Sequence, residues 1–281
     1  MTTQTEKFER FEALHHRQSA FMTPNPWDAG SARLLTGLGF DALATTSAGY
    51  AFSIGARDSA ASLSRAEILA NAKAIVEATA LPVSADLEDG FGAAPEDCAE
   101  TIRAAAQIGL VGGSIEDATG DPADPIYPLV HAVARIEAAV EAARGAPFLL
   151  TARAENFLWG RPDLGDTIAR LQAFEAAGAA ALYAPGLPDL EAIRTVCAAV
   201  SKPVNVVMGL CGPVYSLAEL AEAGVRRVSV GGAFARAALG GLIRAAEEAR
   251  DHGTFTAAAA APAGEALYAL MGPPPPKRRG G

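Results

Sequence analysis

One short unit recurs along this chain of 281 residues: a helical segment, a glycine, a short apolar segment, and then a polar or glycine-rich turn. Four copies read LLTGLGFDALATTSAG, AAAQIGLVGGSIED, FEAAGAAALYAPG and LAEAGVRRVSVGG. Each helix is followed by a glycine, the residue that most readily takes the left-handed conformation at a helix end; these are Gly39, Gly109, Gly178 and Gly224. The unit therefore predicts helices alternating with short strands, which is typical of a parallel sheet.

About eight such strands are predicted, with helices between nearly all of them. They lie near residues 21–24, 41–46, 82–87, 112–116, 147–152, 180–184, 203–207 and 226–230. Eight units of this kind close naturally into a (β/α)8 barrel of the TIM type, and an open doubly wound sheet is the alternative. No linker divides the chain, so we expect one barrel domain over residues 1–272. The tail PPPPKRRGG, residues 273–281, is expected to be disordered.

Composition excludes some classes of partner. The net charge of -9 argues against nucleic acid, because binding to phosphates needs a basic surface. The N-terminal segment is polar, so no signal peptide is predicted. The sequence has no apolar run of about 20 residues, so no membrane span is predicted. Three cysteines without CxxC spacing are typical of reduced thiols. We therefore expect a cytoplasmic protein without a nucleic-acid or membrane partner.

Charged residues follow several predicted strands, where a barrel carries its active site. Asp86 and Glu88 end the third strand, Glu116 the fourth and Arg153 the fifth. Asp86 and Glu88 are two residues apart, so on an extended strand they point to one side. Three converging carboxylates repel one another unless a cation lies among them. Hard oxygen ligands of this kind suit Mg²⁺ or Mn²⁺.

Other polar groups at the same strand ends suit an anionic substrate. Arg153 can hold a carboxylate through its two-pronged guanidinium, and Asn205 ends the seventh strand. Backbone N–H groups of Ser47, Ala48 and Gly49 can hold a second anion, because glycine-rich turns expose them. The sequence therefore predicts a site for a small dianion beside the metal.

Simpler interpretations exist for single residues. An acid after a strand is often a loop residue or a helix cap, which fits Asp28 as a cap and Asp89 and Asp117 as turn residues. Arg153 can be a structural ion-pair partner, and Cys98 and Cys197 fit core positions of helices. Acids on neighbouring strands together with an arginine are harder to explain by coincidence, and this favours the metal site.

Five segments together give a specific resemblance: PNPWDAGSA, TTSAGYAFSIGARD, SADLEDGFG, GGSIEDAT and TARAEN. With them the chain resembles the isocitrate lyase/phosphoenolpyruvate mutase superfamily over most of its length. The resemblance implies a modified (β/α)8 barrel, usually a homotetramer, in which neighbouring subunits exchange the last helix. It also implies Mg²⁺-dependent chemistry on small α-keto or α-hydroxy carboxylates.

The resemblance also implies roles for single residues. Ser47, Ala48 and Gly49 match the turn that binds a substrate carboxylate, and Arg153 matches the substrate-binding arginine. The matches to the Mg²⁺-site carboxylates are Asp86, Glu88 and Glu116, and Asp58 matches an acid near the metal. Asp58, Glu116 and Arg153 are thus the expected catalytic residues, and Asn205 is an expected substrate contact.

The loop after the fourth strand, EDATGDPADPIYPLVH, departs from both well-known subgroups. It lacks the cysteine of the isocitrate and methylisocitrate lyases. It also lacks the lysine and asparagine used in phosphorus–carbon chemistry, although Thr119 is present, and Glu88 stands where Asp is usual. Asp121, Asp124 and Tyr127 are open candidates for a proton donor.

These departures favour a smaller set of reactions. We expect carbon–carbon cleavage or decarboxylation of a small, oxaloacetate-like α-keto dicarboxylate through a metal-stabilised enolate. One alternative is a phosphorus–carbon enzyme of the phosphoenolpyruvate mutase, phosphonopyruvate hydrolase or carboxyphosphonoenolpyruvate mutase type. The other is a keto-acid-binding protein without turnover. The expected assembly is a homo-oligomer, either a dimer or a tetramer.

Overall fold

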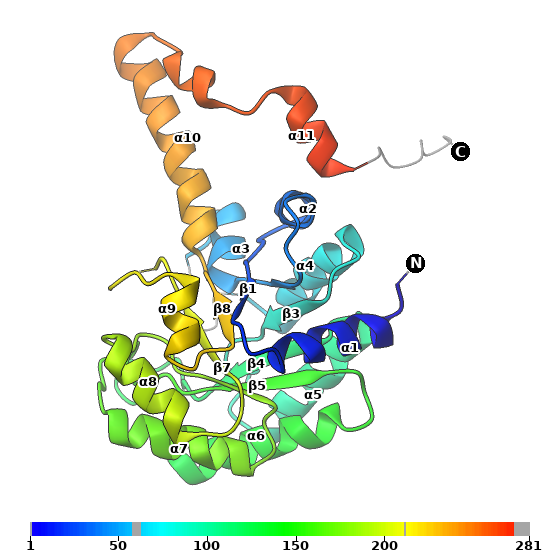
Figure 1. Cartoon of the computed structure of the whole chain (residues 1–281), viewed down its shortest axis with the longest axis vertical. Coiled ribbons are helices and arrows are strands. Elements are labelled where there is room, and N and C mark those ends of the chain that lie inside the picture. The colour runs from blue at the N-terminus through cyan, green and yellow to red at the C-terminus, as the bar shows by residue number, and fades with distance from the viewer. Residues whose placement is uncertain (1, 58–62, 211, 273–281) are drawn as a thin grey trace.

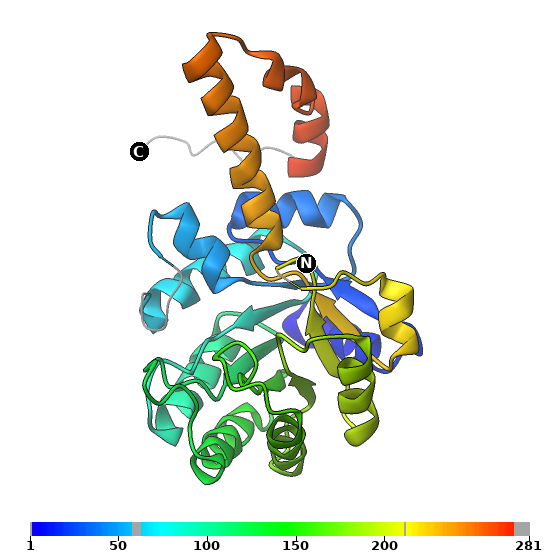
Figure 2. The same ribbon diagram turned by 90° about the vertical axis from the view of Figure 1, so that its left-hand side faces the viewer.

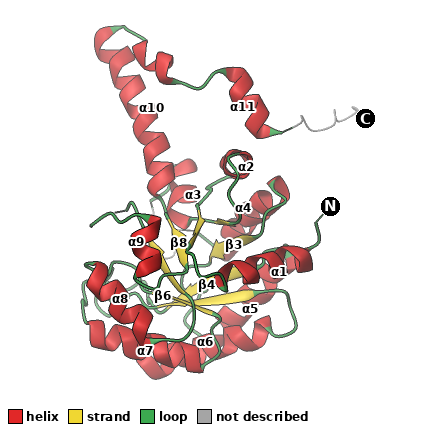
Figure 3. Ribbon diagram, viewed as in Figure 1, coloured by secondary structure: helices red, strands yellow, loops and turns green. Residues whose placement is uncertain are grey.

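Eight parallel strands form the centre of the molecule, which was obtained as a computed structural model that describes residues 2–57, 63–210 and 212–272 (Figures 1 and 3). Neighbouring strands pair in the order β1-β8-β7-β6-β5-β4-β3-β2. A further hydrogen bond, Ala44 N–H to Pro24 C=O at 3.1 Å, links the segments of β2 and β1. The strands are β1 (Phe21–Thr23), β2 (Leu43–Ala44), β3 (Val83–Asp86), β4 (Gly112–Glu116), β5 (Leu149–Arg153), β6 (Ala181–Tyr183), β7 (Val204–Val207) and β8 (Arg227–Ser229). The predicted TIM-type (β/α)8 barrel is confirmed.

Helices surround this nearly closed barrel (Figure 2). They are α1 (Gln4–His15), α2 (Ala29–Gly37), α3 (Ser47–Ser53), α4 (Arg65–Ala78), α5 (Pro95–Gln107), α6 (Leu129–Ala143), α7 (Leu164–Ala176), α8 (Leu190–Ala199), α9 (Leu217–Glu222), α10 (Ala233–His252), the 3-10 helix η1 (Thr256–Ala260) and α11 (Gly264–Met271). The four predicted helix-ending glycines all have positive φ, from 85° to 103°. Asp28 caps α2 as expected, and Ser64 and Ser216 form the capping boxes typical of helix starts.

The main apolar core lies between the strands and the surrounding helices and contains Leu43, Ile75, Ile102, Phe174 and Leu182. Cys98 is completely buried there, and Cys197 is partly buried against the same core. Burial raises the thiol pKa of each cysteine to about 11. The interpretation of both as core residues is confirmed, since a protonated buried thiol is a poor nucleophile.

Helix α1 closes the barrel at the amino-terminal ends of the strands. The Gln4 side-chain amide donates to the carbonyl of Leu110, just before β4, and Lys7 Nζ donates to the carbonyl of Thr79, before β3. At the other end of α1, His15 Nδ1 is 2.8 Å from the Phe11 carbonyl, and its Nε2 is 3.4 Å from Nη1 of Arg227. The ring is therefore neutral, with Nδ1 donating and Nε2 accepting.

This buried histidine makes stability pH-dependent. Burial, followed by the charge of Arg227, lowers the pKa of His15 to about 3 from 6.5. Because the unfolded chain takes up this proton and the folded chain does not, His15 stabilises the fold above about pH 6.5 and loses that contribution as pH falls. The unfolding free energy of the wild type should fall as the pH is lowered from 6.5 to 4. We expect His15→Gln to reduce the slope of this fall by about 1.4 kcal/mol per pH unit.

Urea unfolding at several pH values measures this slope for the wild type and His15→Gln. His252→Gln changes an exposed histidine at the end of α10 and is the control. Equal slopes for all three proteins would show that His15 does not carry the effect.

The C-terminal part forms an arm (Figures 1 and 2). Helix α10 extends away from the barrel, and α11 returns toward α2. There Arg33 Nη1 donates to the Met271 carbonyl at 2.8 Å. Large apolar side chains of the arm are exposed, among them Leu242 (65%), Phe255 (75%) and Tyr268 (76%). In the described part of the chain, no helix combines the length and apolar character needed to cross a membrane.

Candidate active site

Two acids and one arginine meet at the carboxyl ends of β3, β4 and β5. Nη1 of Arg153 lies 3.1 Å from Oε2 of Glu116 and 3.5 Å from Oδ1 of Asp86. Glu116 and Arg153 are register partners on β4 and β5, which places their side chains side by side. All three side chains are 15–20% exposed, so they are largely shielded from water and still reachable. The structure thus brings Asp86, Glu116 and Arg153 together as predicted.

Two further residues enclose Arg153, and sequence reasoning gave neither of them a role. The carboxylate of Glu155, whose side chain is 3% exposed, pairs with Nε of Arg153. The ring of Tyr183, from the end of β6, lies 5.0 Å from the guanidinium carbon. Tyr183 ends β6 and Glu155 follows β5 by two residues, and these positions at strand ends were the available signal. Arg153 is therefore held from two sides before any ligand arrives.

The cluster carries more negative than positive charge. Burial raises the pKa of Glu116 well above its usual value, and repulsion from Glu155, Asp86 and Glu88 raises it further, against the opposing effect of Arg153. Burial likewise raises the pKa of Glu155. A second cation would relieve this repulsion, because opposite charge within a few ångströms favours the ionised carboxylate.

Glu88 does not continue the strand. The sequence interpretation placed Asp86 and Glu88 on one side of an extended strand, and this is wrong in its geometry. β3 ends at Asp86, Gly90 N–H donates back to the Leu87 carbonyl at 2.9 Å, and Glu88 has a φ of 48°. A positive φ ends the alternation of side chains along a strand. Glu88 nevertheless lies near the cluster, since its N–H is 3.4 Å from Oδ1 of Asp86.

The expected anion-binding turn of Ser47, Ala48 and Gly49 is the start of helix α3. Ser47 donates through Oγ to Oδ2 of Asp86 at 2.9 Å and through N–H to the same oxygen at 3.4 Å. Gly49 N–H donates to the capping hydroxyl of Thr46 at 3.2 Å. A Cβ at Gly49 would lie 2.7 Å from Cγ2 of Thr46, so close packing also requires this glycine.

Three other candidates fall in different places. Asn205 is 2% exposed inside the barrel, where its amide accepts from Nε of Arg227 and donates to Ser229 Oγ. Asp58 lies outside the described residues. Asp117, interpreted as a turn residue, is instead a buried anchor: it accepts from Glu155 N–H at 2.8 Å and pairs with Arg170 at 3.1 Å. Burial raises the pKa of Asp117 to about 6.

The donor set fits a divalent cation. Asp86 and Glu116 each place one oxygen near Nη1 of Arg153, so two carboxylates converge on one positive group. Within residues 2–57, 63–210 and 212–272, no three His, Cys, Asp or Glu side chains are grouped as metal ligands. Mg²⁺ does not need such a cage, because it is usually held by one or two carboxylates together with water and substrate oxygens.

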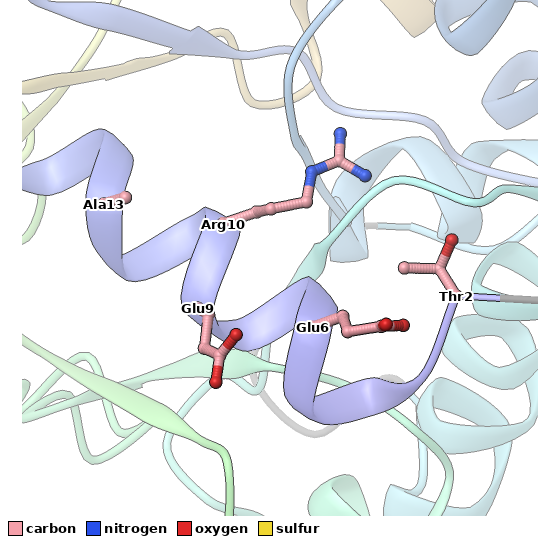
Figure 4. Close-up of a pocket in the computed structure, with 5 residues that line it drawn as sticks. All are labelled: Thr2, Glu6, Glu9, Arg10 and Ala13. Carbon is pink, nitrogen blue, oxygen red and sulfur yellow. The ribbon is translucent and has the colours of Figure 1, made fainter.

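Two hollows elsewhere differ from this cluster in character. One, of about 770 Å³, runs along α1 and is lined by Thr2, Glu6, Glu9, Arg10 and Ala13 (Figure 4). It lies on the helix that closes the opposite end of the barrel. The other, of about 440 Å³, lies between the loops after β4 and β5 and the start of α7, and its lining includes Ile126, Asn156 and Arg161.

A (β/α)8 barrel whose acids and arginine meet at the carboxyl ends of neighbouring strands has the architecture of a barrel enzyme. Residues 11–250 match the family model described as phosphoenolpyruvate phosphomutase. The chain belongs to this family, and with it to the isocitrate lyase/phosphoenolpyruvate mutase superfamily. The predicted superfamily and enzyme class are thereby confirmed.

Three similar proteins illustrate the range of the family. A Burkholderia cenocepacia J2315 structure, assigned provisionally as a lyase/mutase, is 58% identical with a TM-score of 0.93, covering 96% of this chain and 97% of its own. Oxaloacetate decarboxylase of Chromohalobacter salexigens is 28% identical over 246 residues, 86% of this chain and 84% of that protein. The structure of 2,3-dimethylmalate lyase is 28% identical with a TM-score of 0.84, covering 97% and 96%.

Proposed function

We propose that this protein is a Mg²⁺-dependent lyase that cleaves or decarboxylates a small α-keto dicarboxylate of the oxaloacetate type. The observation that carries this proposal is the convergence of the Asp86 and Glu116 carboxylates on Nη1 of Arg153. A divalent ion held by these acids would lie near the guanidinium, and a substrate carboxylate could then contact both. Oxaloacetate decarboxylase and 2,3-dimethylmalate lyase, both relatives of this chain, act on small carboxylates according to their names.

Asp86 and Glu116, with Glu88 nearby, would hold Mg²⁺ or Mn²⁺. A divalent ion held there supplies a positive charge that stabilises negative charge developing on a keto acid as the neighbouring bond breaks. Arg153 would bind the substrate carboxylate, because its guanidinium offers a planar pair of donors. Glu155 and Tyr183 hold that guanidinium in place, so little further ordering is needed when substrate binds.

The start of α3 would hold the second carboxylate. Ser47 contacts Asp86 through both its hydroxyl and its N–H, so the Ser47–Gly49 segment is tied to the proposed metal ligand. Asp58 follows this segment in the chain and stays a proposed acid near the metal. A dicarboxylate could thus reach Arg153 at one end and α3 at the other.

The loop after β4 would cover the site. It folds on itself, with Thr119 Oγ1 donating to the Asp124 carbonyl at 2.6 Å and a bridge between Ala118 and Ile126. Asp124 pairs with Arg161 of the next loop at 3.6 Å. This exposed pair can open easily, since surface ion pairs stabilise by at most about 1 kcal/mol. Water or an acid of this loop would return the proton after bond cleavage.

A product assay tests the proposal. NMR would follow oxaloacetate, 2-oxoglutarate and phosphonopyruvate with Mg²⁺ and again with EDTA, against the uncatalysed rate of each. We expect Mg²⁺-dependent formation of pyruvate, or of oxalate and acetate, from oxaloacetate and no phosphate from phosphonopyruvate. Absence of any new product from all three substrates would contradict a lyase with this substrate class.

A phosphorus–carbon mutase or hydrolase is the second candidate function. The matching family model and the provisional lyase/mutase assignment of the 58% identical structure favour keeping it. It predicts phosphate release or phosphonopyruvate–phosphoenolpyruvate interconversion in the same assay. A binding protein without turnover, the third candidate, predicts Mg²⁺-dependent binding of keto acid and unchanged substrate.

The arm is expected to take part in assembly. We expect α10 and α11 to pack against a second copy of the chain, with the last helix exchanged, in a dimer or tetramer. The exposed Leu242, Phe255 and Tyr268 support this, because several large exposed apolar side chains along one arm are typical of an interface. Sedimentation velocity should show an oligomer that Tyr268→Glu together with Leu242→Glu dissociates; a wild-type monomer would contradict the expectation.

A further inference from the structure

A buried arginine outside the acid cluster holds the turn that carries Glu88. Arg135, on α6, is 1% exposed. Its Nη1 donates to the Gly92 carbonyl at 2.5 Å, and its Nη2 donates to the Asp89 carbonyl. A buried guanidinium is costly to desolvate, and here its donors are directed at main-chain carbonyls of one turn. The arginine therefore fixes the backbone of residues 87–92.

That turn contains strained backbone. Glu88 has a φ of 48° and Phe91 a φ of 62°, in the left-handed region that residues other than glycine seldom adopt. Such conformations are costly and persist only where the surroundings determine them. Besides Arg135, Thr101 Oγ1 donates to the Gly90 carbonyl at 2.8 Å. Two helices, α5 and α6, thus hold the turn in a conformation that it would not keep alone.

The same arginine also contacts the loop after β4. Its guanidinium carbon lies 4.5 Å from the ring centre of Tyr127, close enough for a cation–π interaction. Tyr127 N–H donates to the Asp117 carbonyl at 2.9 Å, and Arg170 Nη1 donates to the Tyr127 carbonyl at 2.9 Å. Asp117 in turn accepts from the N–H of Glu155. Arg135 therefore joins the segments that follow β3, β4 and β5.

We propose that Arg135 is a positioning residue for the acid cluster. It holds the strained turn after Asp86 so that Glu88 stays beside Asp86, whose Oδ1 accepts from Glu88 N–H at 3.4 Å, and through Tyr127 it ties this turn to the loop that would cover the site. Its importance for metal binding rests on the proposed function, whereas its hold on the turn does not. Residues that orient metal ligands typically change metal affinity by 10–100-fold when removed.

The first test measures the turn without any metal. Hydrogen exchange followed by mass spectrometry would compare peptides covering residues 87–92 in the wild type, Arg135→Met, Arg135→Lys and Ile136→Ala. Ile136 is the next residue of α6 and is 2% exposed, so its truncation lowers stability without removing a donor to the turn. We expect faster exchange of this peptide in both Arg135 variants than in Ile136→Ala, measured where all are folded. Equal exchange in the three variants would overturn the proposal.

The lysine variant keeps the test decisive if the methionine variant does not fold. A lysine retains the charge, but its single ammonium cannot reproduce the fork that spans two carbonyls. Arg135→Lys exchanging like Ile136→Ala would therefore also overturn the proposal, because charge alone would then suffice.

The second test measures the consequence for the metal. Calorimetric titration is expected to show that Arg135→Lys binds Mn²⁺ at least about tenfold more weakly than the wild type does. Ile136→Ala is expected to bind Mn²⁺ with wild-type affinity. Equal affinity for all three would overturn the link to the metal site. If the wild type does not bind Mn²⁺ but residues 87–92 exchange faster in the Arg135 variants, the proposed function is contradicted. The role of Arg135 in holding the turn would then still be supported.

Discussion

Replacing Asp86 by alanine is expected to abolish metal-dependent keto-acid binding while the barrel stays folded. Asp86 is the acid that links the proposed metal, Arg153 and the start of α3, through Oδ1 at 3.5 Å from Nη1 and Oδ2 at 2.9 Å from Ser47 Oγ. Turnover should fall by about 10³-fold, equivalent to roughly 4 kcal/mol of transition-state stabilisation. Calorimetric titration with oxaloacetate in Mg²⁺ and in EDTA measures the binding.

The fold should tolerate this change, because it removes one of several repelling acids and leaves Arg153 paired with Glu116 and Glu155. Circular dichroism and the thermal midpoint check this directly. Asp41→Ala is the matched control, since Asp41 forms an exposed surface pair with Arg17 at 3.4 Å. Metal-dependent binding that survives in Asp86→Ala at wild-type strength would place the site elsewhere.

Replacing Arg153 by lysine is expected to have the second large effect. Lysine keeps the charge beside Glu116 and Glu155 but loses the planar fork that can hold a carboxylate with two parallel bonds. We expect the catalytic efficiency kcat/KM for the keto acid to fall by about 10²–10³-fold, or roughly 3–4 kcal/mol. Steady-state kinetics at saturating Mg²⁺ measure the loss.

Methionine at position 153 is the harsher variant. It would leave Glu155, whose side chain is 3% exposed, without its cation, and an unpaired buried charge typically destabilises by about 3–5 kcal/mol. The lysine variant therefore separates binding from stability. Arg144→Lys, at an exposed pair on α6, is the control for a general arginine-to-lysine effect. An Arg153→Lys enzyme within threefold of the wild type would contradict the substrate-binding role.

Local patterns predicted the fold well. Helix-ending glycines such as Gly178, capping boxes such as Ser64 with Glu67, and apolar segments between them depend on interactions within a few residues, so the sequence shows them directly. All eight strands fall within two residues of their predicted starts and ends. Strand order then follows from the alternation of helices and strands.

Only those residues of the site that lie at strand ends could be predicted from the sequence. Asp86, Glu116 and Arg153 end neighbouring strands, so the barrel itself brings them together. The turn after Asp86 was not predictable, because its positive φ at Glu88 depends on Arg135, 47 positions later in the chain. Asp117 appeared to be a solvated turn residue, since only the folded structure shows that Arg170 and Glu155 N–H enclose it.

The contacts of Asn205 are a second feature that the sequence did not predict. A strand-end asparagine is a reasonable substrate contact by sequence, yet its amide here is engaged by Arg227 and Ser229 within the barrel. Its side chain points to a layer where Thr151 and His15 also meet Arg227. Which strand residues reach the site and which fill the interior depends on the stagger of the barrel, which sequence periodicity does not reveal.

The central claim is that Asp86 and Glu116 hold a divalent cation next to Arg153. Anomalous diffraction from crystals soaked with Mn²⁺ and oxalate, a stable dicarboxylate, tests it most directly. We predict one strong peak within ligand distance of Asp86 and Glu116, with oxalate between the ion and Arg153. A peak elsewhere, or no peak in crystals in which these side chains are ordered, would contradict the claim.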